Sequence, residues 1–129
     1  MSAARTEIAR AARRCIGVRF RPQGHDPAHG LDCVGLAGIA FGRGPLPRDY
    51  ALRGGSADGI GEAIAALGLQ RIAAGEGDLL LLATGPGQFH FAVLTEGGLV
   101  HADARLRRVV ETPGRPAWPV VSAWREGSE

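Results

Sequence analysis

The sequence predicts an α+β fold in which helices pack on an antiparallel β-sheet. In the first half of the chain, apolar residues recur every three or four positions, which is the spacing of a buried helix face. From residue 79 onward, short apolar runs are separated by turn residues, as in strands joined by hairpins. The chain has 129 residues, 45% of them hydrophobic, which suffices for one core. We therefore expect a single domain over residues 1–129.

Three helices are predicted ahead of the sheet. The second is rich in glycine, which costs about 1 kcal/mol per residue in an exposed helix. We therefore expect that helix to be buried and closely approached by its neighbours. Gly17 and Gly68 end the first and third helices, and residues 17–32 and 42–55 are predicted loops. The helices are expected over residues 6–16, from Asp32 or Cys33 through residue 42, and over residues 60–67.

Five strands follow the helices in the predicted order. Each is a short apolar run bounded by turn residues, and Glu96-Gly97-Gly98 supplies the turn between the second and third strands. The strands are expected over residues 79–83, 89–95, 99–102 and 108–111, and near residues 120–124.

Composition argues against several classes of partner. The formal net charge is only +2, and the one dense basic group is Arg105, Arg107 and Arg108. A nucleic-acid binder usually carries a longer basic stripe with aromatic residues beside it, so we expect no nucleic-acid partner. No apolar run approaches the ~20 residues of a membrane helix, and residues 1–14 do not resemble a secretion signal. We expect no membrane association and no cofactor.

Cys33 is the candidate nucleophile. It falls in the first turn of the predicted second helix, where unpaired N–H groups and the positive end of the helix dipole favour a thiolate. The other cysteine, Cys15, lies on the apolar face of the first helix, where we expect a small buried side chain. A lone cysteine is more often inert than catalytic, so Cys33 needs a partner.

His90 and His101 are the candidate partners. They lie on consecutive predicted strands, and a four-residue loop over residues 95–98 would pair Leu94 with Leu99 and place His101 opposite Ala92. The two histidines would then be diagonal neighbours on one face, ~7–8 Å apart at Cα and within side-chain reach. A bulge would break this register, and two histidines on one face can also be incidental.

Together these three residues predict a cysteine hydrolase. Cys33 would attack a carbonyl, His90 would take and return the proton, and His101 would fix the tautomer of the His90 ring. A metal-dependent hydrolase is the alternative, because His25 and His29 stand four residues apart and are followed by Asp32. Glycines bracket too short a segment for the helix that zinc ligands at this spacing prefer, so the two histidines could instead line a cleft or be exposed.

Four motifs resemble the NlpC-type cell-wall cysteine peptidases. Residues 15–38, CIGVRFRPQGHDPAHGLDCVGLAG, resemble the region where a helix and a G-x-x-Y segment lead into D-C-S-G. Residues 76–79, EGDL, resemble the P-G-D-L entry to the sheet. Residues 90–94, HFAVL, resemble the H-V-G-I-Y strand, and residues 99–102, LVHA, resemble the F-I-H-A strand. The motifs occur in the family's order and cover nearly the whole chain.

The resemblance implies a papain-like fold and hydrolysis of an amide in peptidoglycan stem peptides, typically after γ-linked D-glutamate. It implies Cys33 as nucleophile, His90 as general base and His101 as the third polar residue. Asp32 matches a position that helps to hold the substrate's free amine in several members, and it also suits an N-cap. Phe20 and Val34 replace the family's usual tyrosine and serine, which removes polar groups linked to substrate recognition.

The compact chain without a signal peptide or wall-binding module resembles the phage-tail branch of the family, including phage-like gene-transfer particles. This implies synthesis in the bacterial cytoplasm, incorporation into a particle tail, and phage-tail or baseplate partners. A structural tail component that keeps the fold without activity is an alternative. The C-terminal segment with Trp118 and Trp124 is either a docking strip or an aromatic cover over the sheet's edge.

Overall fold

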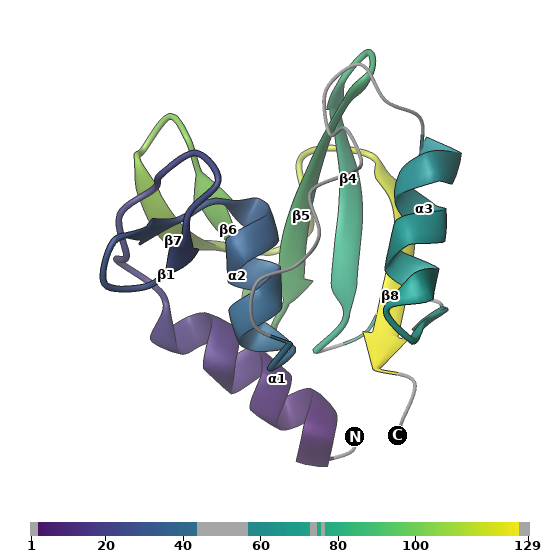
Figure 1. Cartoon of the computed structure of the whole chain (residues 1–129), viewed down its shortest axis with the longest axis horizontal. Coiled ribbons are helices and arrows are strands. Elements are labelled where there is room, and N and C mark those ends of the chain that lie inside the picture. Colours follow the sequence, from purple (N-terminus) through teal and green to yellow (C-terminus); the bar gives the residue numbers. More distant parts are fainter. Residues whose placement is uncertain (1–2, 44–56, 73–74, 76, 127–129) are drawn as a thin grey trace.

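The computed structural model describes residues 3–43, 57–72, 75 and 77–126, and it confirms the predicted α+β class (Figure 1). The loop predicted over residues 42–55 lies outside the described residues from position 44 onward. Within the described ranges, no helix is both long enough and apolar enough to cross a membrane. The helices are α1 (Ala3–Arg14), α2 (Cys33–Ala40) and α3 (Ala57–Ala66), each of which overlaps a predicted helix.

A six-stranded antiparallel sheet forms the centre of the fold, in the order β3-β8-β4-β5-β6-β7. Five of its strands overlap the predicted ones. β3 was not predicted, because Leu69 is the only buried residue among its three and so short a segment shows no alternation. The strands are β3 (Leu69–Arg71), β4 (Leu79–Gly85), β5 (Gln88–Leu94), β6 (Gly98–Asp103), β7 (Arg108–Pro113) and β8 (Val120–Glu126).

The segment predicted as a loop before α2 contains a small hairpin, β1 (His25–Asp26) with β2 (Gly30–Leu31). The hairpin packs closely on α2. A Cβ atom at Gly35, in the first turn of α2, would collide with the carbonyl oxygen of Gly24, so only glycine fits there. The expectation that the glycine-rich helix is closely approached is thereby confirmed.

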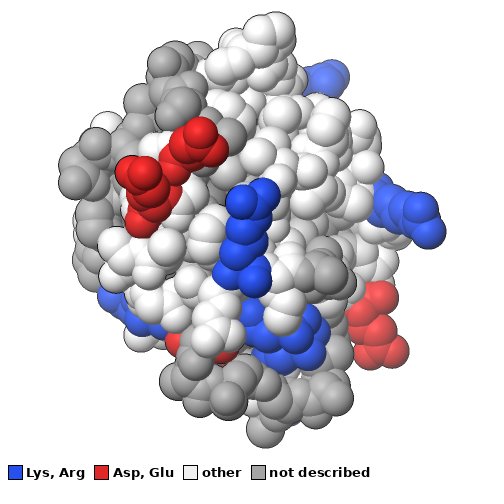
Figure 2. All heavy atoms as spheres, turned by 90° about the vertical axis from the view of Figure 1, so that its right-hand side faces the viewer, with Lys and Arg blue, Asp and Glu red and all other residues white. Residues whose placement is uncertain are grey.

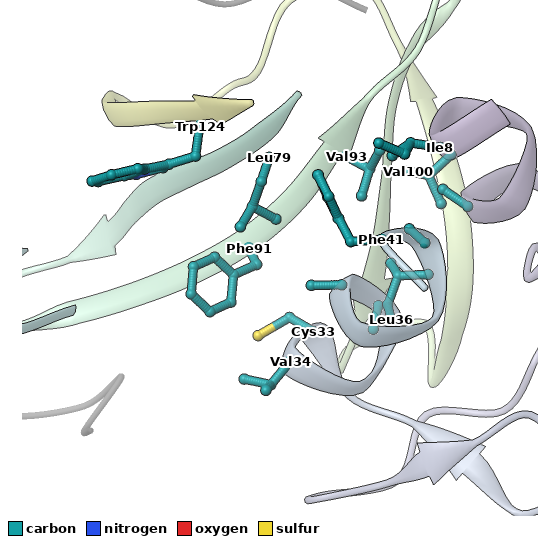
Figure 3. Packing of buried hydrophobic residues seen from close by; sticks show 14 of the residues in the cluster. Ile8, Cys33, Val34, Leu36, Phe41, Leu79, Phe91, Val93, Val100 and Trp124 are labelled. Atoms are coloured by element: carbon teal, nitrogen blue, oxygen red, sulfur yellow. The ribbon is translucent and has the colours of Figure 1, made fainter. Parts of the chain in front are cut away.

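The helices cover one face of the sheet and bury the main core against it. Leu36 of α2 belongs to this core together with side chains from the strands, and Figure 3 shows Cys33 and Val34 at the start of the same helix. The opposite face of the sheet carries a smaller apolar cluster of Leu80, Leu82, Ala92, Leu99 and Ala123. β4 supplies both clusters, which explains its uninterrupted run of four leucines.

Asp78, just before β4, is fully buried at the point where the chain enters the sheet. Its carboxylate accepts two hydrogen bonds from the Arg125 guanidinium, both at 2.9 Å, and one from the backbone N–H of Gly75 at 2.7 Å. The Arg5 Nε atom lies 3.9 Å away. Asp78 therefore joins α1 and β8 to the start of β4. It belongs to the EGDL motif, whose Glu76 lies outside the described residues.

The face of the molecule formed by α3 and β8 carries charges of both signs. Figure 2 shows basic and acidic side chains scattered over it rather than gathered into a stripe. A groove on this side is lined by Asp58, Glu62 and Arg71, together with Ser122 and Trp124. Trp124 is only 6% exposed and packs close to Gly61 of α3, so it covers the sheet.

Candidate active site

Cys33 is the first residue of α2, as predicted. Asp32 is the N-cap: its backbone is extended, and its Oδ1 atom accepts the N–H of Gly35 at 2.9 Å. Its Oδ2 atom accepts the N–H of Gln23 at 2.9 Å, which ties the preceding loop to the helix start. Both contacts hold the backbone on either side of the cysteine.

The predicted site residues come together around one cleft of about 860 Å³. Cys33, His90 and His101 line it, and so do the three residues assigned to substrate binding, Asp32, Phe20 and Val34. Cys33 is only 7% exposed and lines this cleft. α2 packs against both β5 and β6, which brings the cysteine to the strands that carry the two histidines.

The register that brings the histidines together is the predicted one. Leu94 pairs with Leu99 and Val93 with Val100. The pairing of β5 with β6 ends there, one position before Ala92 and His101, and the two strands diverge beyond this point (Figure 1). The imidazole rings still meet, with His90 Nε2 and His101 Nδ1 3.1 Å apart.

Two further residues hold the histidine pair, and the sequence did not reveal either role. The Oγ1 atom of Thr112 lies 3.1 Å from His101 Nε2. The Trp118 ring meets both imidazoles edge to face, with centroid distances of 5.9 Å in each case. Trp118 therefore shields the histidine pair. It also packs on the apolar cluster of the sheet, which confirms the predicted aromatic cover for this residue.

The positions of Thr112 and Trp118 depend on contacts between segments far apart in the sequence. Thr112 lies one residue beyond the predicted end of its strand, and its position opposite Leu99 depends on the pairing of β6 with β7. Trp118 lies in the connection between β7 and β8, whose path no periodicity predicts. Asp103, which also lines the cleft, is held by N–H groups of Arg105 and Leu106.

Both histidines are uncharged at neutral pH. Burial and, to a smaller extent, the neighbouring His101 together lower the pKa of His90 from 6.5 to about 4, against the opposing effects of Asp103 and Asp32. Burial also lowers the pKa of His101, and Asp103 opposes that shift. A neutral imidazole has a lone pair available, so His90 can accept a proton from a nearby thiol.

This shift makes the stability of the protein depend on pH. His90 takes up a proton near pH 6.5 in the unfolded chain but only near pH 4 in the folded protein. Between these pH values, proton binding therefore stabilises the unfolded state relative to the folded one. The free energy of unfolding is expected to decline by about 2 kcal/mol between pH 7.5 and pH 5 through His90 alone. Urea unfolding at both pH values measures it, and the variant His90→Gln should lose this part of the decline. An equal decline in both proteins would contradict the assignment.

The metal-binding alternative has no assembled ligand set. His25 lies on β1 and His29 in the hairpin turn, both with exposed side chains, and His29 Nδ1 lies 3.1 Å from Asp26 Oδ2. Asp32 uses both carboxylate oxygens on backbone N–H groups. Across the described residues, no group of three or more His, Cys, Asp and Glu side chains is placed to hold a metal ion. The segment folds as a hairpin and not as a helix, so a spacing of four residues does not place the two histidines on a common face.

The two thiols are expected to differ in reactivity. Iodoacetamide should alkylate Cys33 below pH 8, because Cys33 lines the cleft at a helix N-terminus, where the local dipole favours the thiolate. Cys15 is 3% exposed, and burial raises the pKa of its thiol, so it should not react in the folded protein. Peptide mapping after a short exposure at pH 6.5 measures both. Labelling of Cys15 first would contradict the assignment of Cys33.

Comparison with known proteins identifies the fold. No model of a protein family matches the sequence, and no curated protein does. Among solved structures, NlpC1 from Trichomonas vaginalis is similar at a TM-score of 0.71 and 20% identity, over 98% of this chain and 45% of that one. The peptidoglycan hydrolase RipB from Mycobacterium tuberculosis is similar at 0.61 and 23%, over 96% of this chain and 64% of that one.

The P60 domain of the M. avium subspecies paratuberculosis antigen MAP1204 is similar at a TM-score of 0.64 and 19% identity, over 98% of this chain and 96% of that domain. The chain spans less than half the length of NlpC1 but nearly all of the MAP1204 domain. The match thus extends over the whole described architecture, helices and sheet together. The papain-like fold implied by the sequence motifs is confirmed, and this chain has the fold of the NlpC/P60 cell-wall peptidases.

Proposed function

We propose that this chain is a cysteine peptidase that hydrolyses amide bonds in peptidoglycan stem peptides. The observation that carries the proposal is a cleft that joins Cys33, at a helix N-terminus, to a neutral His90 held by His101. Similar folds occur in the peptidoglycan hydrolases RipB and SagA, which supports the substrate class.

The proposed reaction has two steps. The Cys33 sulfur attacks the scissile carbonyl while the thiol proton passes to His90, and the developing oxyanion lies near the N–H groups of the first turn of α2. His90 then donates that proton to the departing amine, leaving a thioester on Cys33. In the second step His90 takes a proton from water, whose oxygen attacks the thioester. The carbon–sulfur bond breaks, the acid leaves, and His90 returns the proton to the Cys33 sulfur, which restores the thiol.

Digestion of purified peptidoglycan tests the proposal. Wild-type protein should release fragments that mass spectrometry identifies as products of stem-peptide cleavage, with or without EDTA. Cys33→Ala should release none, while Cys15→Ala serves as the matched control and should behave as wild type. If folded wild-type protein releases no more fragments than Cys33→Ala, the result would contradict the proposed peptidase activity. It would favour the alternative of a structural tail component without activity. Loss of activity in EDTA that zinc restores would favour a metal mechanism.

Asp32 is proposed to help hold the free amine of the substrate. Its carboxylate lines the cleft next to Cys33, and a carboxylate has lone pairs beyond the two that the backbone uses. Stem peptides with a free N-terminal L-alanine should therefore be cut about tenfold faster than N-acylated ones, because a charge-assisted hydrogen bond is lost on acylation. Mass spectrometry of parallel digests measures the ratio. Preference for the acylated peptide would contradict this role, since Phe20 and Val34 offer no polar replacement.

We also propose a site of action on the tail of a phage-like particle, with tail or baseplate proteins as partners. The support for this is the sequence resemblance to the tail-associated branch of the family. Antibody labelling of purified particles by electron microscopy tests it. Label at the tail tip is expected, and particles without label, from cells that make the protein, would contradict it.

A further inference from the structure

Three side chains form a continuous line of polar contacts behind the nucleophile. His90 Nε2 lies 3.1 Å from His101 Nδ1, and His101 Nε2 lies 3.1 Å from Thr112 Oγ1. The sheet dictates the second contact. Thr112 of β7 pairs with Leu99 of β6, and His101 follows Leu99 by two residues, so both side chains lie on the same face.

The protons in this line can be arranged in two ways. Each neutral imidazole carries one proton, and one ring must donate while the other accepts between His90 and His101. In the first arrangement, His90 donates from Nε2, and His101 carries its proton on Nε2 and donates it to Thr112. In the second, His101 donates from Nδ1, and His101 Nε2 accepts the hydroxyl proton of Thr112.

Only the first arrangement leaves a base for the cysteine. When Nε2 of His90 carries the proton, its Nδ1 is unprotonated and can take the proton of a thiol. In the second arrangement Nε2 of His90 is used as an acceptor, and the ring's proton occupies Nδ1. The direction of the contact at Thr112 therefore decides whether His90 is ready to act.

We propose that Thr112 is a positioning residue whose hydroxyl oxygen accepts the Nε2 proton of His101 and thereby keeps Nδ1 of His90 unprotonated. This inference rests on the proposed function of the Cys33 and His90 pair. Thr112 is an exposed residue, so its own hydroxyl proton can be given to water while its oxygen accepts. Trp118 lies edge to face against both imidazoles and covers them from another side, which limits the competition of water for the ring nitrogens.

The tautomers of the two histidines test this directly. Long-range ¹H–¹⁵N NMR at pH 7.5 distinguishes Nδ1–H from Nε2–H in each ring. The wild type should show Nε2–H in both His90 and His101. Thr112→Val removes the acceptor but keeps the shape and suits a β-strand, and it should move His90 toward Nδ1–H. Thr112→Ser is the matched control, because it keeps the hydroxyl, and it should retain the wild-type tautomers.

Kinetics give the second measurement. Thr112→Val should lower kcat about tenfold, the effect of one lost hydrogen bond, with KM unchanged. Thr112→Ser should keep the wild-type kcat. Wild-type protein with Nδ1–H in His101 would overturn the inference, and so would Thr112→Val with unchanged tautomers. These NMR outcomes need no turnover. If the wild type cuts no stem peptide yet shows the expected tautomers, the proposed function fails while the role of Thr112 in setting them stands.

Discussion

The variant His90→Ala is expected to lose all measurable hydrolysis, whereas His101→Asn should keep a reduced rate. Removing His90 leaves no group to take the thiol proton or to return it to the leaving amine, a loss of about four orders of magnitude in kcat. An asparagine at position 101 can still hydrogen-bond His90 Nε2, which His101 Nδ1 now contacts at 3.1 Å. We expect a loss of about ten- to a hundredfold there, with the base still present.

The measurement is the rate at which each variant, at matched concentration, releases stem-peptide fragments from peptidoglycan. The two rates distinguish the role of His90 from that of His101. The free energy of unfolding of each variant at pH 7.5 is the control, because both histidines are largely buried and a folding defect would lower activity without any chemical role. Equal and complete loss in two folded variants would mean that the roles of His90 and His101 are misassigned.

The largest expected effect on stability comes from Asp78→Ala. Asp78 is fully buried, and it accepts two hydrogen bonds from Arg125 and one from Gly75. Its removal leaves the largely buried Arg125 guanidinium without its carboxylate, and loss of one partner from a buried pair costs about 3–5 kcal/mol. The midpoint of urea unfolding should fall accordingly.

The matched control for Asp78→Ala is Glu7→Gln. Glu7 also pairs with an arginine, since Arg14 lies 2.9 Å from its carboxylate, but both side chains are more than half exposed. Solvent screens such a pair, so the unfolding midpoint should remain that of the wild type. Equal effects of the two substitutions would show that the Asp78 network does not hold the entry to β4 in place.

The parts of the site that the sequence predicted are those set by local rules. Asp32 and Cys33 at the start of α2 follow from N-cap chemistry within a few residues. The meeting of His90 and His101 follows from the length of a single turn, because strand residues alternate between faces. The start of α2 and the pairing of Leu94 with Leu99 were therefore accessible without any knowledge of the remaining chain.

The parts that the sequence did not predict depend on segments far apart in the chain. Thr112 reaches His101 through the pairing of β6 with β7, and Trp118 reaches both imidazoles from a connection without periodicity. The hairpin of β1 and β2 likewise depends on its packing against α2, where Gly35 admits the carbonyl of Gly24. Because that segment is not helical, the spacing of His25 and His29 suggested a metal site that does not assemble.

Asp32 places two demands on a single carboxylate. Its oxygens fasten the helix start and the preceding loop, and in the proposed enzyme the same group faces the substrate amine. Loss of an N-cap costs about 1 kcal/mol, so any drift at this position that alters selectivity also loosens the scaffold around the thiol. Selection for stability and selection for substrate choice therefore act on the same atoms.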